Sequence, residues 1–313
     1  MTADAAPAPP LVLLSGDPLR PRRTDPQFAA EAAAARAAGA ATAVLDHEAL
    51  LAGDAERAVS RVPRAAGPAW YRGWMLPADR YAELAAALAA RDCHLLTSPA
   101  AYRTAHELPG WYGTFEPLTP ASAWLPCAPG RPPEPTALAR LAASLGGPDG
   151  PDGPDGPRPV VVKDWVKSRK HEWAEAAYVP DAADPARLAA VVGRFVALQA
   201  EFLTGGVVLR AFEDFDRAVG EARVWWVDGT PVLTGPHPDT PGLCPAPDLA
   251  PVAAAVRRSG LRFVTTDLAL RSDGAWRVVE VGDGQVSGLP AGADPGPLYR
   301  ALAAAPPDPH RHP

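Results

Sequence analysis

The arrangement of short apolar runs changes near residue 158, and this change constrains the fold more than any other feature. Before it, apolar strands alternate with helices, as strands 11–15, 41–45, 69–74 and 94–96 and helices 27–38 and 78–91. Such alternation predicts a small unit built on a parallel sheet. After it, strands follow one another closely, at 207–212, 221–227, 231–234, 262–270 and 275–281, which predicts antiparallel structure. The expected fold is therefore mixed, α/β (α+β), in two parts.

Two connections in the second part are Asp-Gly dipeptides, at 228–229 and 273–274. This dipeptide is the strongest short signal for a β-hairpin. A two-residue turn at 273–274 would place Asp267 directly opposite Glu280 on the paired strands. Opposed like charges destabilise a strand pair, so the two acids predict a cation between them, most simply Mg²⁺ with its oxygen ligands. The alternative is a register one residue different, with Asp267 in a local hydrogen bond.

All three lysines of the chain lie in one eight-residue stretch, as Lys163, Lys167 and Lys170, whereas the other 27 of the 30 basic residues are arginines. An ammonium is compact and can settle among phosphate oxygens, whereas a planar guanidinium needs more room. The apolar run 160–162 predicts a buried strand that delivers Lys163 at its end. The pattern favours a phosphate site over a solvated surface loop.

The bulk properties exclude several classes of protein. A chain of 313 residues suggests about two domains. The formal net charge is −6, and the basic residues outside the lysine cluster are scattered, so no nucleic-acid partner is expected. Three distant cysteines argue against a disulfide framework or zinc site and fit a reducing compartment. No run is long enough for a membrane span. We expect a cytoplasmic protein without a membrane partner, and the oligomeric state stays open.

The strand at 207–212 ends in a charged turn, which suits a hinge whose backbone meets an adenine. The residues expected at this hinge are Arg210, Ala211, Phe212 and Glu213, and the Glu213 carboxylate could accept ribose hydroxyls. On the next strand, Glu221 and Arg223 lie two residues apart and so share one face. These two residues could serve the nucleotide or could form a structural ion pair.

The order of these parts resembles the ATP-grasp superfamily of ATP-dependent ligases. That family has a strand lysine of the form VVVK, a loop over the phosphates, an adenine hinge, an ExR strand and a late strand pair with an acidic metal site. The matching segments here are Val161-Val162-Lys163, residues 164–173, Leu209 to Glu213, Glu221-Ala222-Arg223, and Asp267 with Glu280. The resemblance covers about 100–285, and the preceding part is similar to a pre-ATP-grasp domain.

The resemblance implies a pre-ATP-grasp domain over 1–100 and an ATP-grasp domain over 101–304. The Gly-Pro-Asp repeat at 147–157 predicts a disordered loop within the second domain, and 305–313 predicts a disordered tail. In detail the chain looks most like a divergent bacterial and phage-associated clade that has an extra arginine and a pair of lysines. Segment 70–74 contains the candidate arginine, Arg72.

The implied activity is an ATP-dependent carboxylate–amine ligase that works through an acyl-phosphate, releases ADP, and binds ATP and Mg²⁺ between two antiparallel lobes. Its substrates would be small-molecule or peptide carboxylates and amines. Lys163, with Lys167 or Lys170, would hold phosphates, and Arg223 would contact the γ-phosphate or acyl-phosphate. The implied catalytic residues are Arg223, Lys167 and Lys170; the implied metal ligands are Asp267, Glu280 and Asp283; and Glu221 joins the hinge residues and lysines around the nucleotide.

Two departures from the family pattern leave other functions open. The usual Gly-rich loop is replaced by the lysine-bearing segment 164–173, and the asparagine of the family's ExN metal motif is replaced by Gly282. Asp283, or else Gln285, is expected to supply the missing oxygen ligand. The loss of asparagine favours a nucleotide-binding regulatory or adaptor protein without turnover. A phosphotransferase with a hydroxyl acceptor is the other alternative.

Overall fold

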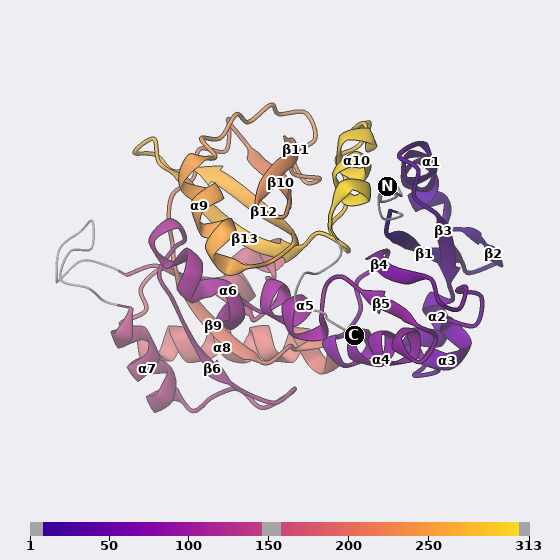
Figure 1. Cartoon of the computed structure of the whole chain (residues 1–313). Helices are drawn as coiled ribbons and strands as arrows, with labels where there is room; N and C mark the ends of the chain where they lie inside the picture. Colours follow the sequence, from indigo (N-terminus) through magenta and orange to yellow (C-terminus); the bar gives the residue numbers. More distant parts are fainter. Residues whose placement is uncertain (1–8, 146–157, 307–313) are drawn as a thin grey trace. The chain divides into compact units, whose positions relative to one another are not determined.

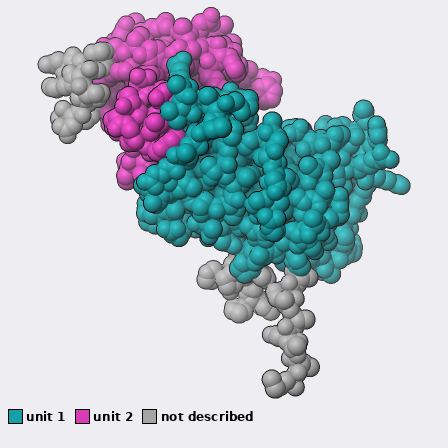
Figure 2. All heavy atoms as spheres, turned by 90° about the horizontal axis from the view of Figure 1, so that it is seen from above, with its two compact units in different colours: residues 1–105, 217–268, 280–313 teal, residues 106–216, 269–279 magenta. Residues whose placement is uncertain are grey.

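The structure, a computed structural model, describes residues 9–145 and 158–306 (Figure 1). It falls into two compact units: unit 1 comprises residues 1–105, 217–268 and 280–313, and unit 2 comprises 106–216 and 269–279 (Figure 2). Each unit is assembled from separate chain segments, whereas the sequence predicted two consecutive domains, whose boundaries stay a prediction. The predicted loop at 147–157 and the predicted tail from 307 onward lie outside the described residues.

The N-terminal sheet of unit 1 is mainly parallel. Its strands are β1 (Leu11–Asp17), β2 (Arg20–Thr24), β3 (Thr42–Leu45), β4 (Gly67–Arg72) and β5 (Cys93–Leu95). Strand β1 pairs in parallel with β3 and β4, and β4 pairs in parallel with β5. Only β2, which the sequence did not predict, runs antiparallel to β1. The predicted parallel sheet is confirmed.

The helices of unit 1 cover both faces of this sheet because β1 is apolar on both. They are α1 (Ala29–Ala37), α2 (His47–Leu51), α3 (Ala55–Ala58), α4 (Ala78–Ala89), α5 (Pro99–His106, which reaches the boundary), α9 (Ala250–Ser259) and α10 (Gly296–Ala304). Leu11 and Leu13 share one core with α2, α3 and α4. Val12 and Leu14 share another with α1 and α10. Successive strand side chains point to opposite faces, so one strand joins two cores. No helix in the described part of the chain is long and apolar enough to cross a bilayer.

A second sheet has the strand order β11-β10-β12-β13. Its strands are β10 (Glu221–Val227), β11 (Thr230–Pro236), β12 (Phe263–Leu270) and β13 (Trp276–Asp283). The predicted two-residue turn at 228–229 is confirmed, since Val227 pairs with Thr230 and both turn residues have positive φ, 46° and 76°. The register shifts by one residue between Trp225 and Trp226, at a β-bulge.

The second hairpin differs from its prediction at the turn. The Arg271 N–H donates to the Ala275 carbonyl at 2.8 Å, so the turn has three residues, and the predicted two-residue turn is wrong. Gly274, at φ 90°, takes the left-handed position that a three-residue turn requires. Carried outward, this register would place Asp267 opposite Val279. The bond from Gly284 N–H to the Phe263 carbonyl instead fits the register in which Asp267 faces Glu280. A one-residue irregularity therefore separates the two ends, and the facing of Asp267 and Glu280 stays a prediction.

Unit 2 is built on an antiparallel sheet of order β6-β9-β7-β8. Its strands are β6 (Ser122–Pro126), β7 (Val160–Asp164), β8 (Tyr178–Val179) and β9 (Gly206–Ala211). Its helices are α6 (Leu108–Phe115), α7 (Pro135–Ser144) and α8 (Pro185–Gln199), with short turns of helix at Glu116–Leu118, Lys170–Glu172, Trp173–Ala177 and Ala200–Phe202. Helices α7 and α8 pack with Val160, Val162, Val207 and Leu209 in one core.

Helix α8 begins as the sequence predicts and ends earlier. The Asp184 side chain accepts hydrogen bonds from the backbone N–H of Ala186 and Arg187, both at 3.0 Å, which is an N-cap. The predicted end at Gly205 is wrong, because the helix stops at Gln199 and Ala200 takes a positive φ of 48°.

Candidate functional site

Lys163 lies near the end of β7, on the face opposite the α7–α8 core. Val160 and Val162 point into that core, so strand alternation directs Lys163 to the other face. Lys163 pairs with Val208 of β9 and is 6% exposed. The predicted delivery of a lysine by a buried strand is confirmed; its role toward phosphate stays a prediction.

A buried carboxylate folds the lysine loop (residues 164–173). The Asp164 side chain is fully buried, and its Oδ1 accepts the backbone N–H of Val166 at 2.7 Å and of Lys167 at 2.5 Å. Its Oδ2 accepts the Gln199 Nε2–H at 2.7 Å and the Thr204 N–H at 3.3 Å. Carboxylates that accept several N–H groups fix a turn strongly. Asp164 therefore determines where the backbone of Lys167 lies.

Two further contacts hold this loop. An ideal Cβ at Gly205, where φ is 71°, would lie 2.1 Å from the Trp165 ring, so the indole packs directly on the glycine backbone. Arg169 donates to the Gln199 side chain at 2.8 Å and to the Leu198 carbonyl. The loop thus has a defined shape without the glycines that the family pattern would supply.

Three aromatic rings gather where the adenine hinge was predicted. Trp173, which is 37% exposed, stacks on Tyr178 with centroids 5.2 Å apart and an interplanar angle of 12°. Phe212, at the end of β9, meets both rings edge-on, at 6.2 Å from Trp173 and 5.3 Å from Tyr178. The lysine loop and the predicted hinge, which includes Ala211 and Phe212, are therefore joined through their aromatic side chains.

Two other predicted hinge residues have structural partners. Arg210 is 7% exposed and donates to the Val278 and Val279 carbonyls, at 3.1 and 2.5 Å. The Glu213 carboxylate accepts two hydrogen bonds from Arg277, both at 2.9 Å. Arg210 thereby ties β9 to β13, and Glu213 is held by a charge that a ribose hydroxyl would have to compete with.

The acidic residues of unit 1 gather around one arginine. Arg223 of β10 donates from Nε and Nη2 to the two carboxylate oxygens of Asp267 on β12, both at 2.7 Å. Although burial lowers the pKa of Arg223, the hydrogen bonds and charge of Asp267, with the charges of Glu280 and Glu221, raise it above its usual value. The structure thus brings together four residues that the sequence singled out, in a bidentate pair with two further carboxylates near it.

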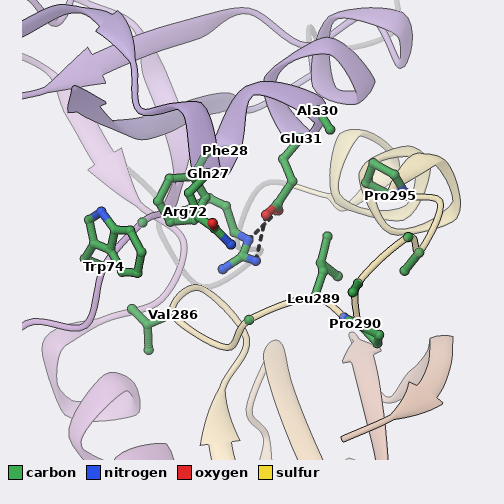
Figure 3. Close-up of a pocket in the computed structure, with 15 residues that line it drawn as sticks. Gln27, Phe28, Ala30, Glu31, Arg72, Trp74, Val286, Leu289, Pro290 and Pro295 are labelled. Carbon is green, nitrogen blue, oxygen red and sulfur yellow. Dashed lines mark hydrogen bonds and ion pairs between the residues drawn. The ribbon is translucent and has the colours of Figure 1, made fainter. Parts of the chain in front are cut away.

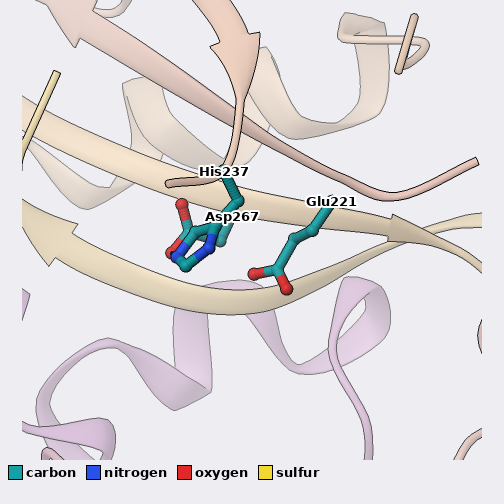
Figure 4. A group of neighbouring side chains, drawn as sticks. All are labelled: Glu221, His237 and Asp267. Atoms are coloured by element: carbon teal, nitrogen blue, oxygen red, sulfur yellow. The ribbon is translucent and has the colours of Figure 1, made fainter. Parts of the chain in front are cut away.

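His237 belongs to the same group, and sequence reasoning missed it. It follows β11, and its N–H donates to the Glu221 carbonyl at 2.7 Å. Ligand atoms of Glu221, His237 and Asp267 all lie within 4.8 Å of one another (Figure 4). The Asp239 N–H donates to Nδ1 of His237, and Nε2 lies 3.6 Å from Asp267. Counting back across the 228–229 turn would have paired Glu221 with residue 236, because the bulge in β10 is not visible in the sequence.

Asp283 lies apart from this group, since it is an odd number of residues from Glu280 and so points to the other face of β13. Its Oδ1 accepts the backbone and side-chain N–H of Gln285, at 2.8 and 3.0 Å. Burial raises the pKa of Asp283 to about 7, against the lowering effect of these bonds. Asp283 and Gln285 form a buried pair, and their role as metal ligands stays a prediction.

Two hydroxyls occupy the space beside Gly282. An ideal Cβ there would lie 2.9 Å from Thr265 Oγ1 and 3.4 Å from Ser287 Oγ. These two oxygens are hydrogen-bonded to each other at 2.8 Å. A side chain at position 282 would have to displace them, so glycine is required while Thr265 and Ser287 are present.

Residues 148–302 match a family described as an ATP-grasp domain, the third family of its clade. No curated protein sequence matches the chain. A solved RimK-domain ATP-grasp protein from Sphaerobacter thermophilus is 16% identical with a TM-score of 0.59, covering 94% of this chain and 98% of that one. The D-cycloserine synthetase DcsG is 20% identical, with the same TM-score and coverage.

The ATP-grasp ligase PsnB, solved with its precursor peptide PsnA2 and AMPPNP, is 15% identical with a TM-score of 0.55, over 96% of this chain and 98% of that one. Identities this low carry the fold and no more. The family match over the second half of the chain and these neighbours over nearly its whole length agree on one fold. The chain is a member of the ATP-grasp superfamily.

Proposed function

We propose that the chain is an ATP-dependent ligase that joins a carboxylate to an amine. The observation that carries the proposal is the group around Arg223, in which Asp267, Glu221, His237 and Glu280 are gathered on the strands of an ATP-grasp fold. Neighbours of this fold are described as ligases, and PsnB is described with Mg and ADP. The substrates would be small molecules or a peptide, as the PsnB precursor suggests.

The donor set around Asp267 fits a divalent cation. Carboxylate oxygens suit Mg²⁺, and an imidazole beside them also suits Mn²⁺. Asp267, Glu221 and His237 would hold the ion, with Glu280 as a further carboxylate, and Asp283 is left out because its carboxylate is held by Gln285. When bound, the ion would neutralise charge on the transferring phosphate.

The chain's own cations would do the remaining electrostatic work. Lys163 and the lysine loop residues Lys167 and Lys170 would bind phosphate oxygens, since Asp164 fixes the loop backbone before any ligand arrives. Arg223 positions Asp267 through two hydrogen bonds and carries a permanent positive charge toward the γ-phosphate. Transfer to the substrate carboxylate would give an acyl-phosphate, and the amine would then displace phosphate.

The test is ADP release over a panel of carboxylates and amines, with hydroxylamine added to trap the acyl-phosphate as a hydroxamate. We expect ADP formation that needs a divalent cation, a carboxylate and either an amine or hydroxylamine. Arg223→Lys should lower kcat by at least roughly 100-fold, because one ammonium cannot make two parallel hydrogen bonds to Asp267. ADP released equally without any carboxylate, and no hydroxamate, would refute the ligase.

A second candidate is a nucleotide-binding protein without turnover. Gly282 favours it, because the hydroxyls of Thr265 and Ser287 fill the place of the asparagine that the family pattern expects. ADP binding by calorimetry, together with an ADP-release screen in which no substrate pair gives turnover above the Arg223→Lys variant, would support this candidate over the ligase.

A further inference from the structure

Unit 1 contains a cavity of about 300 Å³ that the metal group does not use. One wall is formed by the rings of Phe28 and Trp74, which meet edge-on at 5.3 Å, and the opposite wall by loop 286–295 (Figure 3). Glu31 and Arg72 form its floor. This volume is at the lower end of the roughly 300–1,000 Å³ of small-molecule sites, so it suits one small ligand.

The floor is a preorganised ion pair. Arg72 donates from Nε and Nη2 to the Glu31 carboxylate, at 2.6 and 2.9 Å, and from Nη1 to the Gln285 carbonyl at 3.0 Å. The Tyr299 hydroxyl donates to Glu31 at 2.9 Å. Arg72 is 1% exposed and Glu31 5% exposed. Both side chains are therefore fixed before a ligand binds.

The aromatic wall is equally fixed. Trp74 is 45% exposed at the rim, yet its indole N–H donates to Asp25 at 3.0 Å and its backbone N–H to Ser15 at 3.3 Å. A Cβ at Gly73 would lie 2.2 Å from the Ser15 hydroxyl, so only glycine allows this backbone approach. An exposed tryptophan held this tightly is suited to contact a ligand.

A buried ion pair is weak evidence for stability, because apolar residues of the same volume often stabilise as well or better. At the floor of an open cavity, the same pair offers a donor and an acceptor side by side. Arg72 has N–H groups on Nη1 and Nη2 beyond the three used above, and a carboxylate such as that of Glu31 has about four acceptor sites. The chemistry that matches both is a ligand with a carboxylate and an ammonium on one atom.

We propose that this cavity binds a free α-amino acid with an apolar side chain. Its carboxylate would lie toward Arg72, its ammonium toward Glu31, and its side chain along Phe28, Trp74 and Leu289. This inference rests on the proposed ligase in one respect, since the amino acid would be the amine substrate. Binding itself needs neither ATP nor turnover.

The test measures binding of leucine and phenylalanine to the whole chain without nucleotide, by calorimetry and by the rise in melting temperature. Leucinamide and N-acetyl-leucine, which each lack one charge, are the matched ligands. We expect the free amino acids to bind at least roughly 10-fold more tightly than either blocked form, which is about 1.4 kcal/mol. No binding of either free amino acid, or equal binding of the blocked forms, overturns the proposal.

Variants locate the site. Glu31→Leu/Arg72→Met should keep the fold and ADP binding while lowering amino-acid affinity at least roughly 10-fold. The control is Arg80→Met/Glu83→Leu, which removes an ion pair on the surface of α4 and should change nothing. If the double variant does not fold, Trp74→Ala at the rim should weaken binding by a similar factor. Unchanged affinity in a folded variant overturns the site. Amino-acid binding without ADP release would refute the ligase only.

Discussion

Replacing Asp267 with asparagine should cost stability as well as activity. Asp267 accepts both hydrogen bonds of Arg223, and the two side chains are only 4% and 14% exposed. Removing one partner of a buried pair costs about 3–5 kcal/mol. Glu221 and Glu280 lie near the same guanidinium and offset part of this, so we expect a loss of roughly 2–4 kcal/mol for Asp267→Asn.

The chain offers a matched control for this substitution. Asp228 accepts the same two hydrogen bonds from Arg262, at 2.8 and 3.0 Å, but its side chain is 36% exposed. Asp228 also has a φ of 46°, which asparagine tolerates, so Asp228→Asn should cost less than about 1 kcal/mol.

Urea unfolding of both single variants, with Arg223→Met and the double variant Arg223→Met/Asp267→Asn, gives the two costs and the coupling energy. We expect a coupling of roughly 1–3 kcal/mol between positions 223 and 267. If Asp267 were only one of two repelling carboxylates, Asp267→Asn would leave stability unchanged or raise it. That result, or a coupling below about 0.5 kcal/mol, would refute the reasoning.

Three further outcomes follow from features described above. Lys163→Arg should weaken ATP binding measured by calorimetry although charge is kept, and equal affinity would contradict the need for an ammonium. Gly205→Ala should lower stability by roughly 2 kcal/mol or more, because φ is positive and Trp165 fills the space, whereas Gly193→Ala in α8, with no atom near its Cβ, should be neutral or stabilising by up to about 1 kcal/mol. Deleting residues 148–156 should leave melting temperature and ATP binding nearly unchanged, since doubling a loop costs only about 0.6 kcal/mol, and a large loss of either would show that the segment matters.

The sequence predicted most strands because local signals define them. The apolar run before Lys163 and the Asp228-Gly229 turn both form as expected. It could not place residues whose neighbours depend on a bulge. His237 reaches Glu221 only because the register of β10 and β11 shifts by one residue, and no residue type announces that shift.

Composition hid other elements and contacts. Helices α7 and α9 lie in Ala- and Pro-rich stretches without a strong apolar period, and the sequence did not predict them. The contact of Thr265 and Ser287 beside Gly282 joins positions 22 residues apart through side chains with no motif of their own. Such packing is a tertiary property that single-sequence reasoning cannot reach.

The composite core of unit 1 bears on how the chain is synthesised. Val12 and Leu14 near the start pack in one cluster with Phe263, Leu298 and Leu302 near the end. Because ribosomes make the N-terminal segment first, this face of its parallel sheet must wait, uncovered, until nearly the whole chain has emerged. A fragment that stops at residue 105 would expose that face permanently. We therefore expect such a fragment to aggregate or to bind chaperones, and nascent chains to be most vulnerable just before α10 is complete.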